Sequence, residues 1–393
     1  MFKVISLFSG CGGLDLGFKQ AGFEIVWAND FDEDAVKTYK INIGNEIILG
    51  DIKNISSHEM PNNPDIVIGG FPCQGFSVAN IKRSLSDERN FLYKELLRVV
   101  FDKKPKIILA ENVKGLLSMA GGKVLEMIIN DFYEIGYKLT YSVLDSSDYG
   151  VPQKRERVIL VGVPIGEIFH LSLEKQNNKV TVQETIIDLA NIPLSYNSIK
   201  LSNEVIYNHI ASTNVAEKFF ARKNPPKQAD ICDYLKSWRN KSGLSTKKID
   251  EIFGYRHTAG HWFRKDNNSG SIPRPYDWWR LKELLGFDDK YDSQVTEMEE
   301  RTIKFEQSLR ITNWDSPSDT ITATQPEIHI SKERRLSVRE CARIQTFPDD
   351  FVFEGTLSSM YRQVGNAVPP LLSLKIAQAI KKYLMKEKEN VIK

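Results

Sequence analysis

The first 165 residues alternate short runs of β-forming residues with longer amphipathic stretches, and this pattern constrains the fold more than any other feature. The runs lie at residues 4–8, 24–28, 47–49, 66–69, 107–110, 139–144 and 158–163. Strands that alternate with helical segments are typical of a sheet whose crossover helices cover both faces. We therefore expect an α/β fold with a doubly wound, mostly parallel sheet.

The pattern changes near residue 165 and becomes regular again near residue 326. The middle segment lacks the regular spacing and contains five of the six tryptophans. Within it, residues 212–283 carry 15 Lys and Arg against 8 Asp and Glu, a net charge of +7. We expect a first domain of residues 1–165, a second, smaller domain of residues 166–325, and a return segment, residues 326–393, that completes the first domain.

Composition argues against several classes of protein. The 393 residues carry a formal net charge of only +2, so a preference for a polyanion must come from a local region. No CxxC pair occurs among the four cysteines, which argues against a zinc site or a disulfide framework. These are Cys11, Cys73, Cys232 and Cys341. The sequence shows neither a secretory h-region nor an apolar run of about 18 residues. We expect a cytoplasmic protein without a metal centre or a membrane partner.

A glycine-rich turn, SGCGG at residues 9–13, follows the first predicted strand and precedes a helical pattern from Leu14. Backbone N–H groups at such a turn can approach a ligand closely. Asp30 ends the second strand, where a carboxylate can accept hydrogen bonds from both ribose hydroxyls of a nucleotide-like cofactor. Asp51 follows the third strand and could reach an adenine amine. Either aspartate could instead cap a helix, but their succession at strand ends favours a cofactor site.

Further strand ends carry reactive side chains on the same expected edge of the sheet. They are Cys73, Glu111 with Asn112, and the group Gln153, Arg155 and Arg157. The arginines can favour the thiolate of Cys73, and an acid at Glu111 can share a proton with a ring nitrogen. A buried cysteine, a strand-end cap and a surface ion pair are the alternatives. Convergence on one edge favours the reactive interpretation, and the lack of a nearby histidine argues against a Cys–His hydrolase.

Six motifs follow one another along the chain: LFSGCGGLDLGF, GGFPCQGFS, ENVKGL, DYGVPQKRERV, RRLSVRECARIQTFPDDF and GNAVPP. In this order they resemble the motifs of the DNA (cytosine-5) methyltransferases of bacterial restriction–modification systems. The resemblance excludes only residues of about 165–320, where that family has its variable target-recognition domain. It implies a Rossmann-like methyltransferase fold, with double-stranded DNA as the substrate and S-adenosyl-L-methionine as the cofactor.

The resemblance also implies a covalent mechanism on a cytosine swung out of the duplex. Cys73 would add to C6, and Glu111 would contact N3 and the exocyclic amine. Carbon 5 would then attack the methyl group of S-adenosylmethionine, and loss of the C5 proton would release the cysteine. Arg155 would hold the cytosine carbonyl and nearby backbone, and Arg157 would support the site. Implied DNA contacts near the target are Gln74, Ser77 and Gln153.

The same resemblance implies a set of cofactor-binding residues. Asp30 would take the ribose hydroxyls, Phe31 would stack on adenine, and Asp51 would bind the adenine amine. Further residues would line the part of the pocket that holds the methionine group of the cofactor, or would close the pocket. Those residues are Phe8, Ser9, Gly10, Gly12, Gly13, Leu14, Ile52, Asn366 and Val368.

Residues 245–265 in the basic segment predict a helix-turn-helix-like unit, with a first helix from Ser245 to Phe253 and a turn at Gly254. Arg256 and Arg264, together with His257 and His261, are then candidate base or phosphate contacts. Two short helices around a glycine turn are common, so a purely structural role stays open. The polar residues 78–90 predict a mobile loop that closes over DNA.

Other functions stay open from the sequence. An RNA methyltransferase would share the motifs, although the size and charge of the middle segment favour DNA. A DNA-binding module without catalysis would not need Cys73, Glu111 and Arg155, and a nicotinamide-linked dehydrogenase gives no reason for PCQ or ENV. We expect a monomer, with a cognate restriction endonuclease as a possible partner that acts independently. The sequence does not identify the DNA target.

Overall fold

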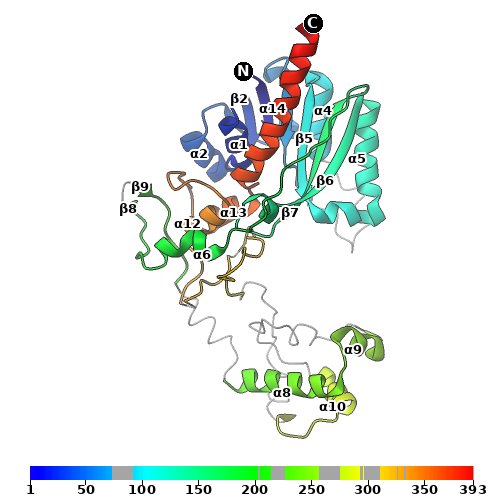
Figure 1. Cartoon of the computed structure of the whole chain (residues 1–393), viewed down its shortest axis with the longest axis vertical. Helices are drawn as coiled ribbons and strands as arrows, with labels where there is room; N and C mark the ends of the chain where they lie inside the picture. The colour runs from blue at the N-terminus through cyan, green and yellow to red at the C-terminus, as the bar shows by residue number, and fades with distance from the viewer. Residues whose placement is uncertain are drawn as a thin grey trace. The chain divides into compact units, whose positions relative to one another are not determined.

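The computed structural model describes residues 1–72, 92–201, 204–213, 226–255, 275–292, 295, 310–324, 326–331 and 333–392. The chain forms two compact units, which are drawn in Figure 1. Unit 1 comprises Met1–Ile210, Asn313–Gln325 and Ser337–Lys393, and unit 2 comprises Ala211–Thr312 and Pro326–Leu336. Residues 166–210 thus group with unit 1, whereas we expected a boundary at residue 165. The reason is that α6 (Val182–Ile186) packs against α12 (Val338–Ile344) of the same unit.

Unit 1 is built on a seven-stranded sheet with the order β3-β2-β1-β4-β5-β7-β6. The neighbouring pairs among β3, β2, β1, β4 and β5 are parallel, and β7 is antiparallel to both β5 and β6. The strands are β1 (Lys3–Leu7), β2 (Glu24–Asp30), β3 (Ile47–Leu49), β4 (Ile66–Gly69), β5 (Ile107–Val113), β6 (Tyr137–Asp145) and β7 (Glu156–Pro164). Each predicted strand is observed, and the doubly wound, mostly parallel α/β fold is confirmed.

Helices cover the sheet because alternate strand residues point to opposite faces. Ile5 and Leu7 of β1 join Leu96, Val99 and Ile128 of two helices in one buried cluster. Those helices are α4 (Leu92–Lys103) and α5 (Lys123–Glu134). Elsewhere in unit 1, α1 (Gly13–Gln20) packs against the final helix, α14 (Pro370–Ile392), which runs alongside the strands in Figure 1.

The crossing of α1 and α14 is close enough to require a glycine. A Cβ atom at Gly17 would lie 2.4 Å from the backbone nitrogen of Leu374. The Ser373 hydroxyl also donates a hydrogen bond to the carbonyl of Leu14. The C-terminal segment of the chain is therefore an integral layer of unit 1, beside the helix that follows the glycine-rich turn.

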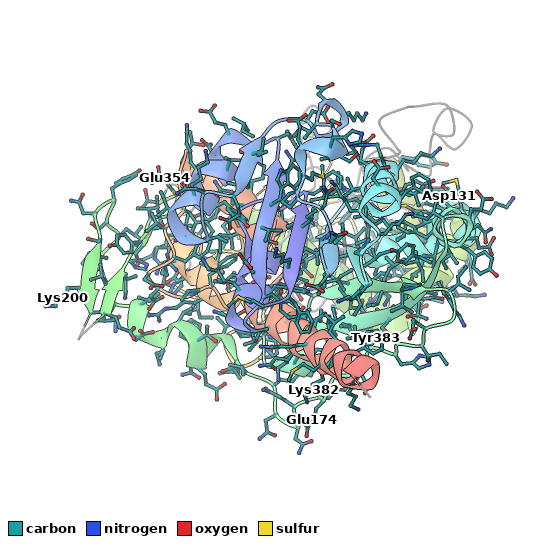
Figure 2. The ribbon with its side chains drawn as sticks, turned by 90° about the horizontal axis from the view of Figure 1, so that it is seen from above. Asp131, Glu174, Lys200, Glu354, Lys382 and Tyr383 are labelled. Carbon is teal, nitrogen blue, oxygen red and sulfur yellow. The ribbon has the colours of Figure 1, made fainter. Side chains whose placement is uncertain are left out.

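Shorter elements complete unit 1. They are α2 (Glu33–Asn42), α13 (Leu357–Asn366), the hairpin of β8 (Ile199–Leu201) and β9 (Glu204–Ile206), and the 3-10 turns η1 (Ile52–Asn54), η2 (Ser57–Glu59), η5 (Lys114–Gly122), η6 (Ser146–Tyr149) and η7 (Ile187–Leu189). Viewed from above, Lys200 of the hairpin and Asp131 of α5 lie at opposite sides of unit 1 (Figure 2). At α12, Ser337 and Glu340 form a reciprocal capping box, which satisfies two backbone donors that helix ends leave free.

Unit 2 contains α8 (Pro226–Ser242), α9 (Thr246–Phe253) and α10 (Pro275–Leu285). Their core includes Ile231, Ile249 and the fully buried Trp278. Helix α9 begins after Ser245, whose side chain accepts a hydrogen bond from the backbone N–H of Lys248, and ends at Gly254 with φ at 73°. The first predicted helix of the 245–265 unit is thus confirmed, and the second, with Arg256, His257, His261 and Arg264, lies outside the described residues.

Candidate active site

A cavity of about 830 Å³ opens at the carboxyl ends of β1, β2, β4 and β5 in unit 1, with residues of α13 and the following turn as its wall. The sheet order reverses between β1 and β4, which is the switch point where open α/β sheets bind ligands. Every predicted cofactor residue except Gly12 lines this cavity: Phe8, Ser9, Gly10, Gly13, Leu14, Asp30, Phe31, Asp51, Ile52, Asn366 and Val368. Glu111, Arg155 and Arg157 line it too.

The glycine-rich turn forms the floor between β1 and α1. Gly10 and Gly12 both have positive φ, at 55° and 94°, a backbone conformation that favours glycine. No atom lies within 4 Å of a Cβ built at Gly10, so its surroundings are open. A Cβ at Gly13 would lie 2.5 Å from the Val368 carbonyl oxygen, so the turn and the C-terminal segment meet backbone to backbone. Gly12 instead packs toward Tyr39, away from the cavity lining.

Asp30 lies at the end of β2 and is 8% exposed. One carboxylate oxygen accepts a hydrogen bond from the Gly10 N–H at 2.8 Å, and the other accepts one from the Asp32 N–H at 2.9 Å. Burial raises the pKa of Asp30, and these backbone donors oppose the shift. A carboxylate oxygen has more than one lone pair, so both oxygens retain capacity toward hydroxyl donors in the cavity.

Two neighbouring residues form the outer rim of the cavity. Phe31 is 74% exposed, which leaves a flat aromatic face available for stacking. Asp51 accepts a hydrogen bond from the backbone N–H of Lys53 at 3.1 Å and so caps η1. The cap that the sequence left as an alternative is therefore present, and the same carboxylate still lines the cavity.

A buried ion pair lies at the opposite end of the cavity. Nε of Arg157 lies 2.8 Å from Oε1 of Glu111, and both side chains are nearly buried. Burial raises the pKa of Glu111, and the positive charges of Arg157 and Arg155 oppose the rise. Room for this carboxylate depends on Gly70, since a Cβ there would lie 3.1 Å from Glu111 Oε2.

The strand that carries Glu111 is tied to the segment that leads to Cys73. Asn112 donates a hydrogen bond from Nδ2 to the Phe71 carbonyl at 3.0 Å. This bond fixes the end of β5 against the chain that follows β4, and Phe71 and Pro72 line the cavity. Cys73 itself, with Gln74, Ser77 and the predicted loop at 78–90, lies outside the described residues.

The two arginines occupy different environments. Arg155 is 1% exposed, and its terminal nitrogens donate to the carbonyls of Ile321 at 3.2 Å and Gly365 at 2.9 Å. Burial and the neighbouring Arg157 lower the pKa of Arg155 to about 9. Arg155 therefore holds two segments of the chain together, and Arg157 is the arginine that meets the Glu111 carboxylate.

Gln153 lies in the interior, which corrects the expectation of a DNA contact there. Its side chain is fully buried. The amide nitrogen donates to Gln345 Oε1 at 2.9 Å, and the amide oxygen accepts from the Ile321 N–H at 2.9 Å. With both ends of the amide engaged, Gln153 joins the motif loop to the C-terminal segment, and we no longer assign it a DNA contact.

Sequence reasoning missed several residues of the cavity wall. Arg362 of α13 lines the cavity and forms a 2.8 Å ion pair with Asp32, the residue that caps α2. Asn29 and Cys11 also line the cavity. Asn29 and Cys11 could have been predicted from their positions in the sequence, since Asn29 precedes Asp30 and Cys11 lies inside the glycine-rich turn. Arg362 stands four residues before Asn366 on the same helix, a spacing that brings side chains to one face.

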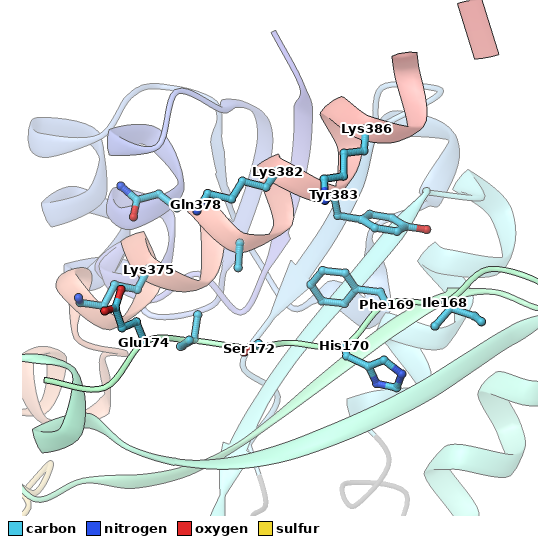
Figure 3. Close-up of a pocket in the computed structure, with 12 residues that line it drawn as sticks. Ile168, Phe169, His170, Ser172, Glu174, Lys375, Gln378, Lys382, Tyr383 and Lys386 are labelled. Carbon is cyan, nitrogen blue, oxygen red and sulfur yellow. The ribbon is translucent and has the colours of Figure 1, made fainter. Parts of the chain in front are cut away.

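A second hollow of about 530 Å³ lies between α14 and the segment after β7 (Figure 3). The rings of Phe169 and Tyr383 meet edge to face there, with centroids 5.1 Å apart. Lys375, Lys382 and Lys386 of α14 line it, and its lining includes none of the predicted site residues. Among the described residues, no group of three or more His, Cys, Asp or Glu could hold a metal ion, and no helix is long and apolar enough to cross a membrane.

Comparison with known sequences identifies the family. The model of the C-5 cytosine-specific DNA methylase family matches residues 2–382. The chain is 35% identical over 387 residues to the Type II methyltransferase M.NgoFVII of Neisseria gonorrhoeae, covering 96% of this chain and 86% of the relative. It is 34% identical over 398 residues to the Type II methyltransferase M.FnuDI of Fusobacterium nucleatum, covering 100% and 97%. The chain therefore belongs to the C-5 cytosine-specific DNA methylase family and is a DNA (cytosine-5) methyltransferase.

Solved structures show the same fold. A prophage-encoded Escherichia coli protein, proposed to be a DNA modification methyltransferase, matches with a TM-score of 0.61 at 22% identity and covers 98% of this chain and 99% of its own. The methyltransferase EhMeth of Entamoeba histolytica matches with a TM-score of 0.56 at 16% identity, with the same coverage. These matches confirm the predicted Rossmann-like methyltransferase fold of the chain.

Proposed function

We propose that this cavity transfers a methyl group from S-adenosylmethionine to C5 of a cytosine in duplex DNA, through a covalent bond between Cys73 and C6. The observation that carries the proposal is the joint occupation of one cavity by the glycine-rich turn with Asp30 and by the Glu111–Arg157 pair. A glycine-rich turn that suits a cofactor and a carboxyl–guanidinium pair that suits acid–base chemistry thus line one cavity at the switch point of the sheet.

The residues of the cofactor end fit S-adenosylmethionine. Asp30 offers acceptor capacity to two ribose hydroxyls, and the exposed ring of Phe31 suits a flat purine. The open surroundings of Gly10 allow close approach of a ligand to the backbone. Asn366 and Val368 close the opposite wall. The cofactor, when bound, supplies an electrophilic methyl group on a positively charged sulfonium.

The chemical step needs a nucleophile and a group that makes the cytosine ring electron-poor. The Cys73 thiolate forms a bond to C6, and the electrons of the C5–C6 double bond move to C5. Protonated Glu111 hydrogen-bonds N3 as this charge develops, which burial of the carboxyl favours. C5 takes the methyl group and the neutral sulfide leaves. A water molecule or another base in the site then takes the C5 proton, and the electron pair left behind re-forms the double bond as the bond to Cys73 breaks.

Arg157, rather than Arg155, is the arginine that we assign to the base. Its guanidinium already lies beside the carboxylate that would face N3. A donor at that place can hold the cytosine carbonyl and keep Glu111 oriented. Arg155 is committed to two backbone carbonyls, so we assign it the support of the site.

A stacked cytosine cannot enter this cavity, so we propose that the base is swung out of the duplex, at a cost of a few kcal/mol. We propose that unit 2 and the basic run that includes Arg256 and Arg264 supply the DNA contacts outside the cavity, and that Gln74 and Ser77 lie beside the target. Two relatives are named Type II methyltransferases, which supports a protective role in a restriction–modification system. A companion endonuclease would act on the same site independently, and the enzyme would work as a monomer.

Bisulfite sequencing tests this function directly. DNA from cells that express the wild type is compared with DNA from cells that express Cys73→Ala. We expect one short sequence whose cytosine resists conversion only with the wild type. Methylation that persists in the variant would overturn the assignment of Cys73, and complete conversion in both would overturn the proposed activity.

A further inference from the structure

Below the cofactor cavity lies a buried carboxyl group to which the proposed reaction assigns no role. Asp15 is fully buried in the first turn of α1 and does not line the cavity. Its Oδ1 accepts a hydrogen bond from the Ser6 hydroxyl at 2.6 Å. Its Oδ2 is buried and has no hydrogen-bond partner among the described residues. A buried acid that is only half satisfied costs free energy, so its retention calls for an explanation.

A chain of hydroxyl groups connects Asp15 to the cavity. The Ser9 hydroxyl donates to the Ser6 hydroxyl at 2.9 Å, with the Ser6 carbonyl oxygen as a longer second acceptor at 3.2 Å, and the Ser6 hydroxyl donates in turn to Asp15. Ser6 and Ser9 both line the cavity, and Ser9 begins the glycine-rich turn. An ionised carboxylate can only accept hydrogen bonds, so it turns the Ser6 O–H toward itself and leaves the Ser6 oxygen to accept the proton of Ser9. Ser9 Oγ is then left with lone pairs, and no proton, to offer to the cavity.

Several groups set the charge of Asp15. Burial raises the pKa of Asp15 to about 7, while the nearby hydroxyl groups of Ser6, Tyr39 and Ser9 oppose the shift and the negative charge of Glu46 adds to it. The first turn of α1 favours a negative charge through the helix dipole. In the described part of the chain, the other titratable groups that act on Asp15 or on its neighbours are all acidic. They are Tyr39 of α2, Glu46 before β3, Asp30 of β2 and Cys11 of the turn.

We propose that Asp15 is a positioning residue that, through Ser6 and Ser9, turns an acceptor toward the cavity and favours the positively charged sulfonium cofactor over the uncharged sulfide product. The inference rests on the proposed function, because it takes S-adenosylmethionine as the ligand. In a water-poor interior the negative charge is weakly screened, so it acts on a cation beyond direct contact. When Asp15 takes up a proton it can donate to Ser6, and both the charge and the orientation of the chain are lost.

The test measures dissociation constants of S-adenosylmethionine and S-adenosylhomocysteine by calorimetry on the full chain, between pH 5.5 and 8.5 and without DNA. The quantity of interest is the preference, the affinity for the cofactor divided by that for the product. For the wild type we expect the preference to rise by about five- to tenfold as pH increases through about 7, the size of an ordinary coupling between two sites. Asp15→Asn keeps an acceptor for Ser6 but removes the charge, so its preference should stay at the low-pH value.

Controls separate this effect from others. The amines of both ligands titrate on their own, so each pH is compared between wild type and variant. Asp131→Asn is the matched variant, because Asp131 accepts a hydroxyl donor from Tyr93 at 2.7 Å and is outside the cavity lining. It should reproduce the wild-type preference at every pH. If Asp15→Asn does not fold, Ser9→Ala removes the acceptor at the cavity and should lower the preference in the same direction.

The outcomes are distinguishable. If neither ligand binds the wild type, the proposed cofactor is wrong. If both bind but Asp15→Asn weakens them equally, or preserves the wild-type dependence on pH, then Asp15 has only a structural role and the inference is overturned. If Asp15→Asn weakens the binding of S-adenosylmethionine and leaves the binding of S-adenosylhomocysteine as in the wild type, the inference is supported.

Discussion

The two ends of the cavity hold their polar groups in different ways. At the cofactor end, Asp30 is fixed by backbone N–H donors from Gly10 and Asp32, which lie close to it in the fold of one β-α-β unit. At the chemical end, Glu111 depends on the charge of Arg157 and on the space left by Gly70. At a site held by backbone donors, the change of one side chain should lower the affinity for the ligand only moderately, because the backbone donors stay in place. A site of buried opposite charges depends on both partners, so single changes there should have larger effects.

Glu111→Gln should produce the largest loss among the described residues. Glutamine fills the same space but cannot give a proton to N3, so turnover should fall by roughly 10²- to 10⁴-fold. The affinity for S-adenosylmethionine should stay unchanged, because the cofactor end is independent. Single-turnover methylation and calorimetry check the two parts. Glu156→Gln is the control, since Glu156 forms an exposed ion pair with Lys114 one residue from Arg157. If Glu111→Gln lost as much affinity for S-adenosylmethionine as it lost turnover, the two ends of the cavity would not be independent.

The pH dependence of turnover should also reveal the role of Glu111. Burial raises the pKa of Glu111, so its protonated form persists to higher pH than that of an exposed glutamate. A step that needs this proton slows as pH rises through the raised pKa. The pH profile of single-turnover rates should therefore show a falling limb on its basic side that is absent in Glu111→Gln. The same limb in both proteins would exclude Glu111 as its source.

Most of the cavity lining around Asp30 could be predicted from the sequence, and the surroundings of Glu111 only in part. The turn at 9–13 and Asp30 belong to one strand-turn-helix-strand unit, so short-range rules place them together. The partners of Arg155 and Gln153 could not be identified from the sequence, because Ile321 and Gln345 are far away along the chain. The sequence of a motif is the same whether its arginine binds a substrate or donates to a buried carbonyl. Only the packed structure distinguishes the two.

Arg155→Ala should cost stability. The change leaves the buried carbonyls of Ile321 and Gly365 without their donor and opens a cavity, which should lower the free energy of unfolding by about 2–4 kcal/mol. Arg157→Ala should instead lower turnover more than stability, because the buried Glu111 can respond by taking up a proton. Urea unfolding and single-turnover assays of both variants check this. Equal losses of stability would show that the two arginines share one role.

Asp30→Asn should weaken the cofactor end by an intermediate amount. The amide keeps one acceptor oxygen, so one of the charge-assisted hydrogen bonds is lost and affinity for S-adenosylmethionine should fall by about tenfold. Asp65→Asn is a matched control, since Asp65 accepts from the Lys3 N–H at 2.8 Å beside the amino end of β4. Calorimetry should show wild-type affinity for that control. An unchanged affinity in Asp30→Asn would contradict the ribose assignment.

Phe31→Ala should have the smallest effect. Loss of one stacking face should reduce cofactor affinity by about two- to tenfold, with little effect on stability, because the ring is 74% exposed. Phe101→Ala on α4 removes another exposed ring, 57% accessible and outside the cavity lining, and should leave affinity unchanged. If both variants bind the cofactor like the wild type, adenine does not stack at Phe31.

The recognition of DNA was the least predictable part of the molecule. Helix α9 and its capping residues follow local rules, which is why Ser245 and Gly254 were correctly placed at its ends. The tryptophans of the middle segment do not by themselves mark a DNA surface, since Trp278 is fully buried in the core of unit 2. Which bases are read depends on side chains whose partner is the DNA itself, and no periodicity in the chain encodes that partner.

The covalent step is the central claim, and trapping it is the most direct test. DNA that carries 5-fluorocytosine at the methylated position has no C5 proton to lose, so the bond between Cys73 and C6 should persist after methyl transfer. Mass spectrometry of the digested complex should find the nucleotide on the Cys73 peptide of the wild type, with far less in Glu111→Gln. An adduct on Cys11, or efficient methylation of ordinary DNA with no trapped adduct on its fluorinated counterpart, would contradict the account.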